Sequence, residues 1–431
     1  MKVARTREER ILLKLIAGTA LAFVIAGFIV QPPQSVLLGI GHILSPNNIL
    51  VTDFIELGGV GGAFAQAGLL TLVGCALYYL TGAKVDGAAV GCLYMLLGFA
   101  LFGKTLINVW PIMLGVALYA RYKREPVREI VTVAIFATAL SPIFTQVAFN
   151  SALSRWISVP LGFFLCVLLG FVIPSIARQL FRAHNGFTLY NMGFVAGILG
   201  SVVVAVLSSY GLRAQPAMVW SSGSDKQILV MIVLILVSLV AAGLQIERNP
   251  WKAYRDLHRQ TGQAPTDFLA ASGFGATLLN MASVGVIATC YVLFIGADLN
   301  GPVLGGIVSV IGFGACGKHS LNILPIFVGV ILGALLKPYG LTDPAVVWAA
   351  LFGTCLAPMA GRFGPQWGIL AGFLLVSVGQ TTGVLSAGLN LYGNGFAAGL
   401  IASVLSAVAL SISKQRRGTD QPQEVQQVPA A

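Results

Sequence analysis

Long apolar runs occupy nearly all of this 431-residue chain. Hydrophobic residues make up 57% of the sequence and charged residues only 10%, whereas a soluble domain carries roughly 25% charged residues. As a helix, an apolar run of about 17 to 25 residues is long enough to cross a hydrocarbon core about 30 Å thick. Because the runs are continuously apolar and do not alternate with polar residues, they predict helices rather than a membrane β-barrel. The sequence therefore predicts an all-α polytopic membrane protein.

The runs predict about fourteen transmembrane helices. The first begins at Ile11 behind "MKVARTREER" and has no well-placed small-residue cleavage site, which indicates a retained span rather than a signal peptide. The third, fourth, tenth and eleventh spans are short, so each neighbouring pair could instead be broken or re-entrant. The predicted spans are 11–31, 59–81, 87–103, 105–121, 128–149, 157–180, 191–210, 227–246, 269–295, 301–316, 320–336, 344–360, 366–386 and 395–413.

Lysine and arginine give the orientation, because they are retained in short cytoplasmic loops while spans are inserted. With the N-terminus inside, the cytoplasmic segments receive 17 of the 26 basic residues, and the opposite side receives five. This distribution predicts a multi-pass membrane protein with both termini in the cytoplasm. The net charge of +11 then follows from the topology and needs no nucleic acid partner.

An internal repeat is the strongest signal in the chain. "GKTLINVWPIMLGV" begins at Gly103 and "GKHSLNILPIFVGV" begins at Gly317. At this fixed offset of 214, residues 52–116 and 266–330 share 18 identities in 65 positions without a gap. Further along, "LYNMGF" from Leu189 matches "LYGNGF" from Leu391. The expected parts are a cytoplasmic N-terminus (1–10), a first membrane repeat (11–210), a connecting loop (211–226), a second membrane repeat (227–413) and a disordered cytoplasmic tail (414–431).

The number of spans in each repeat predicts how the repeats are oriented. Seven is an odd number of crossings, so the second homologous seven-helix half starts on the outer face and runs inverted relative to the first. Inverted repeats are typical of secondary transporters, which open one central site alternately to the two sides of the membrane. The alternative is that the repeated glycines and prolines only allow close helix packing.

Polar residues inside the repeated segment are the candidate substrate-binding residues. Lys104 and Lys318 each follow a glycine at a predicted helix junction, where a lysine is costly unless it reaches the surface or meets a partner. Asn108 and Asn322 stand four residues later, on the same helical face as the lysines. A lysine at such a junction can bind an anionic group and an amide can bind a polar ligand. The alternative is a pair of ordinary interfacial lysines.

Four residues of the segment are candidates for a helix break. Gly103 and Gly317 precede the lysines, and Pro111 and Pro325 follow the asparagines. A proline removes a backbone N–H and frees a carbonyl one turn earlier. In transporters, broken helices use such groups to coordinate substrates or ions, although a kink without a ligand is the alternative.

Asp53 and Asp267 occupy equivalent positions in the motif "TDF" and are candidate ion-coupling residues, together with His319. Either aspartate can hold a proton or a sodium ion, or balance the charge of a lysine. Each also has the position of a helix N-cap, which is the structural alternative. His319 can titrate near neutral pH, but a single buried histidine is commonly a hydrogen-bonded packing residue.

The sequence gives no sign of an enzyme, a cofactor or a metal site. All six cysteines lie in apolar runs, without a CxxC pair or a neighbouring histidine cluster. No phosphate-binding loop, nucleophile motif or zinc-protease helix is present. The expected partners are the lipid bilayer and a small-molecule or ion substrate, and a homo-oligomer is compatible with the sequence.

The duplicated "TDF", "GK" and "N..P" elements and the "LYNMGF" and "LYGNGF" segments resemble a bacterial family of integral membrane proteins of unknown function, DUF1576. The resemblance covers about residues 10–413 and implies two homologous halves, but it implies no substrate. In architecture alone, a seven-plus-seven inverted repeat is similar to nucleobase and anion transporters that use paired half-helices. We therefore expect a secondary transporter for a small polar or anionic solute, and the resemblance implies a location in the bacterial cytoplasmic (inner) membrane. The alternatives are a channel for small neutral solutes and a membrane scaffold subunit without transport activity.

Overall fold

The computed structural model describes residues 5–45, 52–150, 152–212 and 219–416, and within these ranges regular secondary structure is helical apart from two isolated β-bridges. The helices of the first half are α1 (Arg7–Val30), α2 (Pro33–Ile43), α3 (Phe54–Thr81), α4 (Gly87–Phe99), α5 (Trp110–Lys123), α6 (Val127–Ala137), η1 (Thr138–Leu140), α7 (Pro142–Ala148), α8 (Arg155–His184) and α9 (Asn191–Ser209). The helices of the second half are α10 (Asp225–Ile246), α11 (Trp251–Leu257), α12 (Phe268–Ser272), α13 (Phe274–Ile295), α14 (Gly301–Phe313), α15 (Ser320–Leu335), α16 (Pro344–Gly353), η2 (Thr354–Leu356), α17 (Ala357–Phe363), α18 (Pro365–Leu385) and α19 (Gly393–Arg416).

The length and composition of the helices identify a multi-pass membrane protein. Within the described ranges, nine helical segments are long and apolar enough to cross a membrane, or ten if the bent pair α6–α7 is counted as one span. Large apolar side chains on the outside are highly exposed, among them Ile29 (78%), Trp156 (92%) and Phe294 (81%). Such exposure is unfavourable in water and is expected for helices that face lipid.

Each predicted span coincides with a helix or with a broken helix pair. The short predicted spans at 87–103 and 301–316 are the 13-residue helices α4 and α14, which at 1.5 Å per residue are about 20 Å long. Neither helix alone is long enough for a bilayer core of about 30 Å. Two short helices, α2 and α11, were not predicted. Both follow prolines, Pro32 and Pro250, which favour the start of a helix.

The two halves repeat the same local irregularities. Gly59 (φ +68°) interrupts α3, and Gly273 (φ +81°), 214 residues later, separates α12 from α13. Only glycine adopts such a backbone conformation without strain. In addition, α6–η1–α7 and α16–η2–α17 are each a helix interrupted by a short 3₁₀ turn. The repeat found in the sequence is therefore also present in the order and the bending of the helices.

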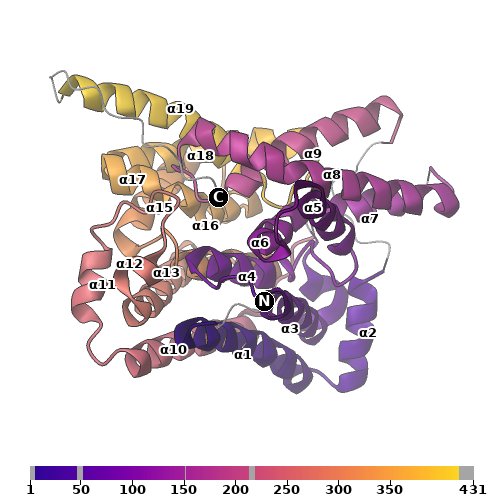
Figure 1. Cartoon of the computed structure of the whole chain (residues 1–431), viewed down its shortest axis with the longest axis horizontal. Coiled ribbons are helices and arrows are strands. Elements are labelled where there is room, and N and C mark those ends of the chain that lie inside the picture. Colours follow the sequence, from indigo (N-terminus) through magenta and orange to yellow (C-terminus); the bar gives the residue numbers. More distant parts are fainter. Residues whose placement is uncertain (1–4, 46–51, 151, 213–218, 417–431) are drawn as a thin grey trace.

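Helix α4 lies at the centre of the molecule, with α1 and α10 along the lower edge of Figure 1 and α9 and α19 across the upper edge. It packs against α14 through glycines. A Cβ atom added to Gly98 would lie 2.5 Å from the carbonyl oxygen of Gly305, and one added to Gly312 would lie 3.3 Å from the Cα atom of Gly91. Since the start of each helix contacts the end of the other, α4 and α14 are antiparallel. This central pair joins the two halves.

Candidate functional site

Lys104 lies in a break between α4 and α5, which we call the Lys104 loop (residues 100–109). Gly103 has a φ of +90°, which turns the chain after α4. The Lys104 side chain is fully buried (0% exposed). Its Nζ donates a hydrogen bond to the hydroxyl of Tyr392, 2.5 Å away, and lies 5.5 Å from the ring centroid of Phe99. A lysine from the first half thus binds a tyrosine from the second half.

Lys318 forms the equivalent arrangement with the roles of the two halves exchanged. It lies between α14 and α15 in the Lys318 loop (residues 314–319), after Gly317 with a φ of +128°. Its side chain is also fully buried (0% exposed). Its Nζ donates to the hydroxyl of Tyr190 at 2.8 Å and lies 5.2 Å from the ring centroid of Phe313. Each unit of the site therefore consists of a lysine and a phenylalanine from one half and a tyrosine from the other.

The lysines have no carboxylate partner. No ion pair within the described residues includes Lys104 or Lys318, since the three that occur join other side chains. Burial of an ammonium group without an opposite charge is costly, and the tyrosine hydroxyls and ring faces offset only part of that cost. In its protonated form, each lysine therefore lacks an opposite charge among the described residues.

Two buried amides hold the lysine loops in place. Gln66 donates from Nε2 to the carbonyl oxygens of Ala100, at 2.5 Å, and Lys104, at 3.2 Å. At the equivalent position of the second half, Asn280 donates from Nδ2 to the carbonyl oxygen of Gly314 at 2.7 Å. Asn280 Nδ2 also donates to the backbone carbonyl oxygen of Lys318 at 2.8 Å. The amides bind carbonyls that the broken helices leave free.

Asn108 and Asn322, predicted to bind substrate, close the lysine loops from the other side. Asn108 donates from Nδ2 to the carbonyl oxygen of Gly103 at 2.9 Å and accepts from the backbone N–H of Thr105 at 2.9 Å. Asn322 makes the same pair of contacts at 2.8 Å with Gly317 and His319. Both ends of each amide are engaged, so the geometry makes these asparagines positioning residues.

The four predicted break residues have two different positions. Gly103 and Gly317 lie within the breaks themselves, as described above. Pro111 lies in the first turn of α5, where a missing N–H costs no helical hydrogen bond. Pro325 lies inside α15. The breaks therefore precede both prolines and are formed by the glycine-lysine segments.

Asp53 and Asp267 each cap a helix of their own half and bind the start of a central helix of the other half. Asp53 is fully buried and accepts hydrogen bonds from the N–H of Ile55 at 2.9 Å, the N–H of Gly301 at 3.3 Å and the hydroxyl of Ser221. Asp267 accepts from the N–H groups of Leu269 at 3.0 Å and Gly87 at 3.2 Å. The aspartates are brought to the ends of the α4–α14 pair and not to the lysine side chains.

His319 follows Lys318 directly and is buried in the second half. Its Nε2 lies 2.9 Å from the carbonyl oxygen of Gln260, and its ring packs edge-on against His258 at 5.3 Å between centroids. The second ring nitrogen, Nδ1, is buried without a hydrogen-bond partner among the described residues. With Nε2 as the donor, the geometry leaves Nδ1 as an acceptor.

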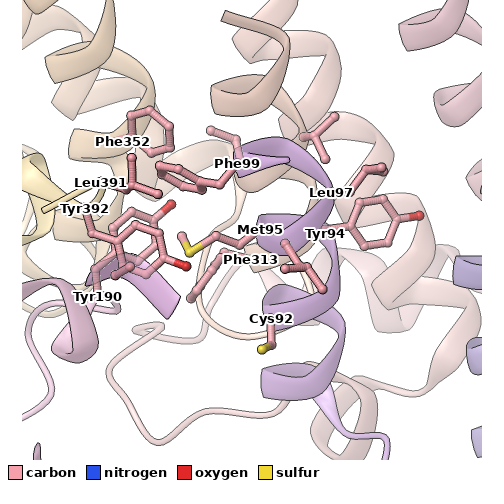
Figure 2. Packing of buried hydrophobic residues seen from close by; sticks show 14 of the residues in the cluster. Cys92, Tyr94, Met95, Leu97, Phe99, Tyr190, Phe313, Phe352, Leu391 and Tyr392 are labelled. Carbon is pink, nitrogen blue, oxygen red and sulfur yellow. The ribbon is translucent and has the colours of Figure 1, made fainter. Parts of the chain in front are cut away.

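A cavity of about 510 Å³ lies beside the two tyrosines. Figure 2 shows Met95 and Phe99 pointing from α4 toward Tyr190 and Tyr392. The other walls come from α16, from the end of α18 and from the glycine-rich segment that leads into α19. The lining residues are Met95, Phe99, Phe102, Tyr190, Ala345, Trp348, Phe352, Gly379, Gln380, Gly383, Val384, Ser386, Ala387, Gly388, Asn390, Leu391, Tyr392, Gly393, Asn394 and Gly395. This volume is in the range of about 300 to 1,000 Å³ of small-molecule sites.

Tyr190 and Tyr392 were not among the predicted site residues. Their signal was present, because they are identical members of the repeated "LYNMGF" and "LYGNGF" segments. What the sequence does not give is the crossing of the pairs, in which each lysine binds the tyrosine of the other half. Within the described residues, no cluster of three or more histidine, cysteine or acidic side chains is arranged to hold a metal ion.

A family model described as "Protein of unknown function (DUF1576)" matches residues 32–209 and 246–411. The two matched segments include both lysine loops and both tyrosines. No curated protein and no solved structure matches the chain.

Proposed function

The chain belongs to the DUF1576 family, and we propose that it is a secondary transporter that moves a small anionic or polar solute across the bacterial inner membrane by alternating access. The observation that carries this proposal is the pair of buried lysines. Lys104 and Lys318 lie at equivalent helix breaks, and each binds the tyrosine of the opposite half beside a common cavity.

The inverted arrangement of two seven-helix halves is part of the proposal. It is supported by the antiparallel packing of α4 against α14 and by the recurrence of the Lys–Tyr and Asp–helix contacts with the halves exchanged. The proposal places a pseudo-two-fold axis between α4 and α14 that relates these contacts. Such symmetry allows a transporter to adopt an inward-open and an outward-open conformation that are related by exchanging the conformations of the two halves.

The uncompensated positive charge favours an anion. A buried cation without a counter-ion is stabilised by any anion that enters its neighbourhood, because Coulomb attraction is strong where water is excluded. The tyrosine hydroxyls lie between the lysines and the cavity, so they can link a lysine to an anion in the cavity through hydrogen bonds. Each accepts a hydrogen bond from a lysine and keeps its own O–H to donate.

Segments from both predicted sides of the membrane pack around the cavity and the tyrosines. Trp348 of the cavity wall packs against Trp220 of the connecting segment at 5.8 Å between ring centroids, and the predicted topology places that segment outside. On the opposite side, Gln263 and Ala264 bind the carbonyls of Asn185 and Gly186, at 2.6 and 3.0 Å, over the segment that leads to Tyr190.

The experiment is solute uptake into proteoliposomes, guided by a thermal-shift screen of the purified protein against small anions, amino acids, sugars, nucleobases and urea. Lys104→Gln and Lys318→Gln should each weaken anion binding by about tenfold to a hundredfold, the value of a hydrogen bond to a charged group. Lys337→Gln is the matched control, because Lys337 is a partly exposed lysine outside the site.

The outcomes separate the candidate functions. Saturable uptake that is lost in both lysine variants and retained in Lys337→Gln supports the transporter. Flux that does not saturate indicates a channel. Wild-type binding and uptake in both folded lysine variants would remove the lysines from the site, and no flux with any solute would favour a scaffold subunit.

A further inference from the structure

The cavity beside the two tyrosines is lined by aromatic rings, and several of these rings carry hydrogen-bond donors without an acceptor. We propose that its ligand is a planar aromatic carboxylate, a ring small enough for the cavity that carries an oxyanion. This inference rests on the proposed transport function and specifies the substrate class of the same site.

The aromatic wall is continuous. Phe99 packs against Tyr392 at 4.6 Å, Phe102 at 4.7 Å and Phe352 at 5.2 Å between ring centroids. Phe102 in turn stacks on Trp348 at 5.6 Å. Figure 2 shows Phe99, Phe352 and Tyr392 grouped at one side of α4. Flat rings with their neighbours fixed in edge-on and stacked contacts form a surface on which another flat ring packs better than a flexible chain does.

The polar groups of the cavity are mainly donors without an acceptor. The hydroxyls of Tyr190 and Tyr392 each accept from a lysine Nζ, so their hydrogens are free to donate. The indole N–H of Trp348 is buried without a partner among the described residues. Buried donors are almost always satisfied in native proteins. A site with several unsatisfied donors beside two lysines that have no carboxylate partner among the described residues calls for an acceptor, and a carboxylate is a strong one.

Two amide side chains also line the cavity. Gln380 lies near the end of α18 and Asn394 at the start of α19, and both line the cavity. Neither side chain has a hydrogen-bond partner in the part of the chain that the structure describes. Asn394 has no amide equivalent in the first half, where Met192 stands. These amides provide the asymmetry that one ring substituent requires.

The size of the cavity separates this class from small inorganic anions. About 510 Å³ is far more than one inorganic anion fills, and a ligand gains affinity by excluding water from apolar walls. An anion without a ring would leave the aromatic side chains in contact with water. A sugar can pack a C–H face on an aromatic ring, but it carries no oxyanion for the Lys–Tyr pairs to bind.

The test is a set of four probes on the full-length purified protein: benzoate, cyclohexanecarboxylate, acetate and benzamide, with affinity measured by calorimetry and tryptophan fluorescence. Benzoate should bind about tenfold more tightly than cyclohexanecarboxylate, the gain expected from one or two specific ring contacts. Acetate carries the carboxylate without the ring, and benzamide carries the ring without the negative charge. Both should therefore bind more weakly than benzoate. Cyclohexanecarboxylate is more apolar than benzoate, so partition into detergent would produce the opposite order.

Phe99→Leu should remove the preference for benzoate over cyclohexanecarboxylate while the lysines remain. Phe23→Leu is the control, since Phe23 is a buried ring that packs against Phe64 away from the cavity. Phe352→Leu tests the same wall if Phe99→Leu does not fold.

Equal affinities for benzoate and cyclohexanecarboxylate, both lost in Lys104→Gln, would overturn the aromatic class and leave the anion transporter intact. Benzamide binding as tightly as benzoate would overturn the oxyanion. If none of the four probes binds while another solute of the broader screen is transported, this inference is wrong and the transport function stands. If no solute of the screen is transported, the transport function fails.

Discussion

At the scale of single residues, the site depends on side chains that hold the lysine loops rather than on the lysines alone. Gln66 and Asn280 come from different residue types but make equivalent contacts, each with two backbone carbonyls of a lysine loop. Those carbonyls have lost their helical partners because the chain turns away at Gly103 and Gly317. A buried carbonyl without a donor is costly, so the amides stabilise the break itself.

A substitution of Asn280 tests whether the amide stabilises the helix break. Asn280→Leu keeps a side chain of similar size but leaves the carbonyls of Gly314 and Lys318 without their donor. We expect a loss of about 1–3 kcal/mol in the free energy of unfolding, measured by thermal unfolding in detergent, together with weaker anion binding. Thr289→Val in the same helix is the control, because the buried Thr289 hydroxyl donates within its own helix to the carbonyl of Gly285 at 2.8 Å. Equal unfolding temperatures for the two variants would contradict the role of the amide.

At this scale the sequence was informative about residue types and less so about roles. The spacing within "GKTLIN" and "GKHSLN" identified the lysines and the glycines as special, and the structure places all four at the breaks. It did not separate a ligand-facing amide from a loop-closing one, because Asn108 and Asn322 have the same position along a helix in either case. Only the backbone path shows that both amides turn back to their own loops.

At the scale of elements, the α4–α14 pair is the part on which the arrangement of the halves depends. The two helices approach closely because glycines meet at both ends of the contact, Gly98 with Gly305 and Gly91 with Gly312. Glycines at such positions let helices in membranes pack at short distance. The Asp53 and Asp267 carboxylates then bind the N-terminal ends of α14 and α4, where the helix dipole favours a negative charge.

A methyl group at this contact should disturb it. In Gly305→Ala the new Cβ atom would lie 2.6 Å from the carbonyl oxygen of Gly98, so one of the two backbones has to shift. Overpacking of this kind costs about 1–3 kcal/mol, and uptake should fall with stability. Gly18→Ala in α1 is the matched control, since a Cβ there has no neighbour within 4 Å. It should leave the unfolding temperature unchanged or raised. If Gly305→Ala matches the wild type in both measurements, the close contact is not required.

The helices themselves could be predicted better than their breaks. Continuous apolar runs determine where a helix crosses, and every predicted span has its helix. The interruptions at Gly59 and Gly273 and the short 3₁₀ turns have no composition of their own, because glycine is frequent throughout the chain. Their positions depend on how the surrounding helices pack, so they could not be predicted from local sequence. The helices α2 and α11 were missed since they are too short for a hydrophobic span.

At the scale of the whole molecule, contacts between distant segments fall into two groups that agree with the charge distribution. One group includes the pair of Arg178 with Glu125 at 2.8 Å and the bond of Gln263 to Asn185. The other includes the bond from the N–H of Leu299 to Asp225 at 2.8 Å. The segments of the first group are those that the basic residues predict to be cytoplasmic, and the segments of the second are predicted to be outside.

This division makes a prediction about labelling. In a background with Cys290→Ser, which removes the exposed cysteine, single cysteines at Arg124, Lys226 and Arg255 report the side of the membrane, because all three side chains are exposed. We expect a membrane-impermeant maleimide to label Lys226→Cys in intact cells, and to label Arg124→Cys and Arg255→Cys only after permeabilisation. The reason is that the proposed topology places seven crossings between the start of the first half and the start of the second, so that equivalent segments face opposite sides. Labelling of Arg124→Cys or Arg255→Cys in intact cells would overturn the topology. It would also remove the inverted repeat on which alternating access between the two Lys–Tyr units depends.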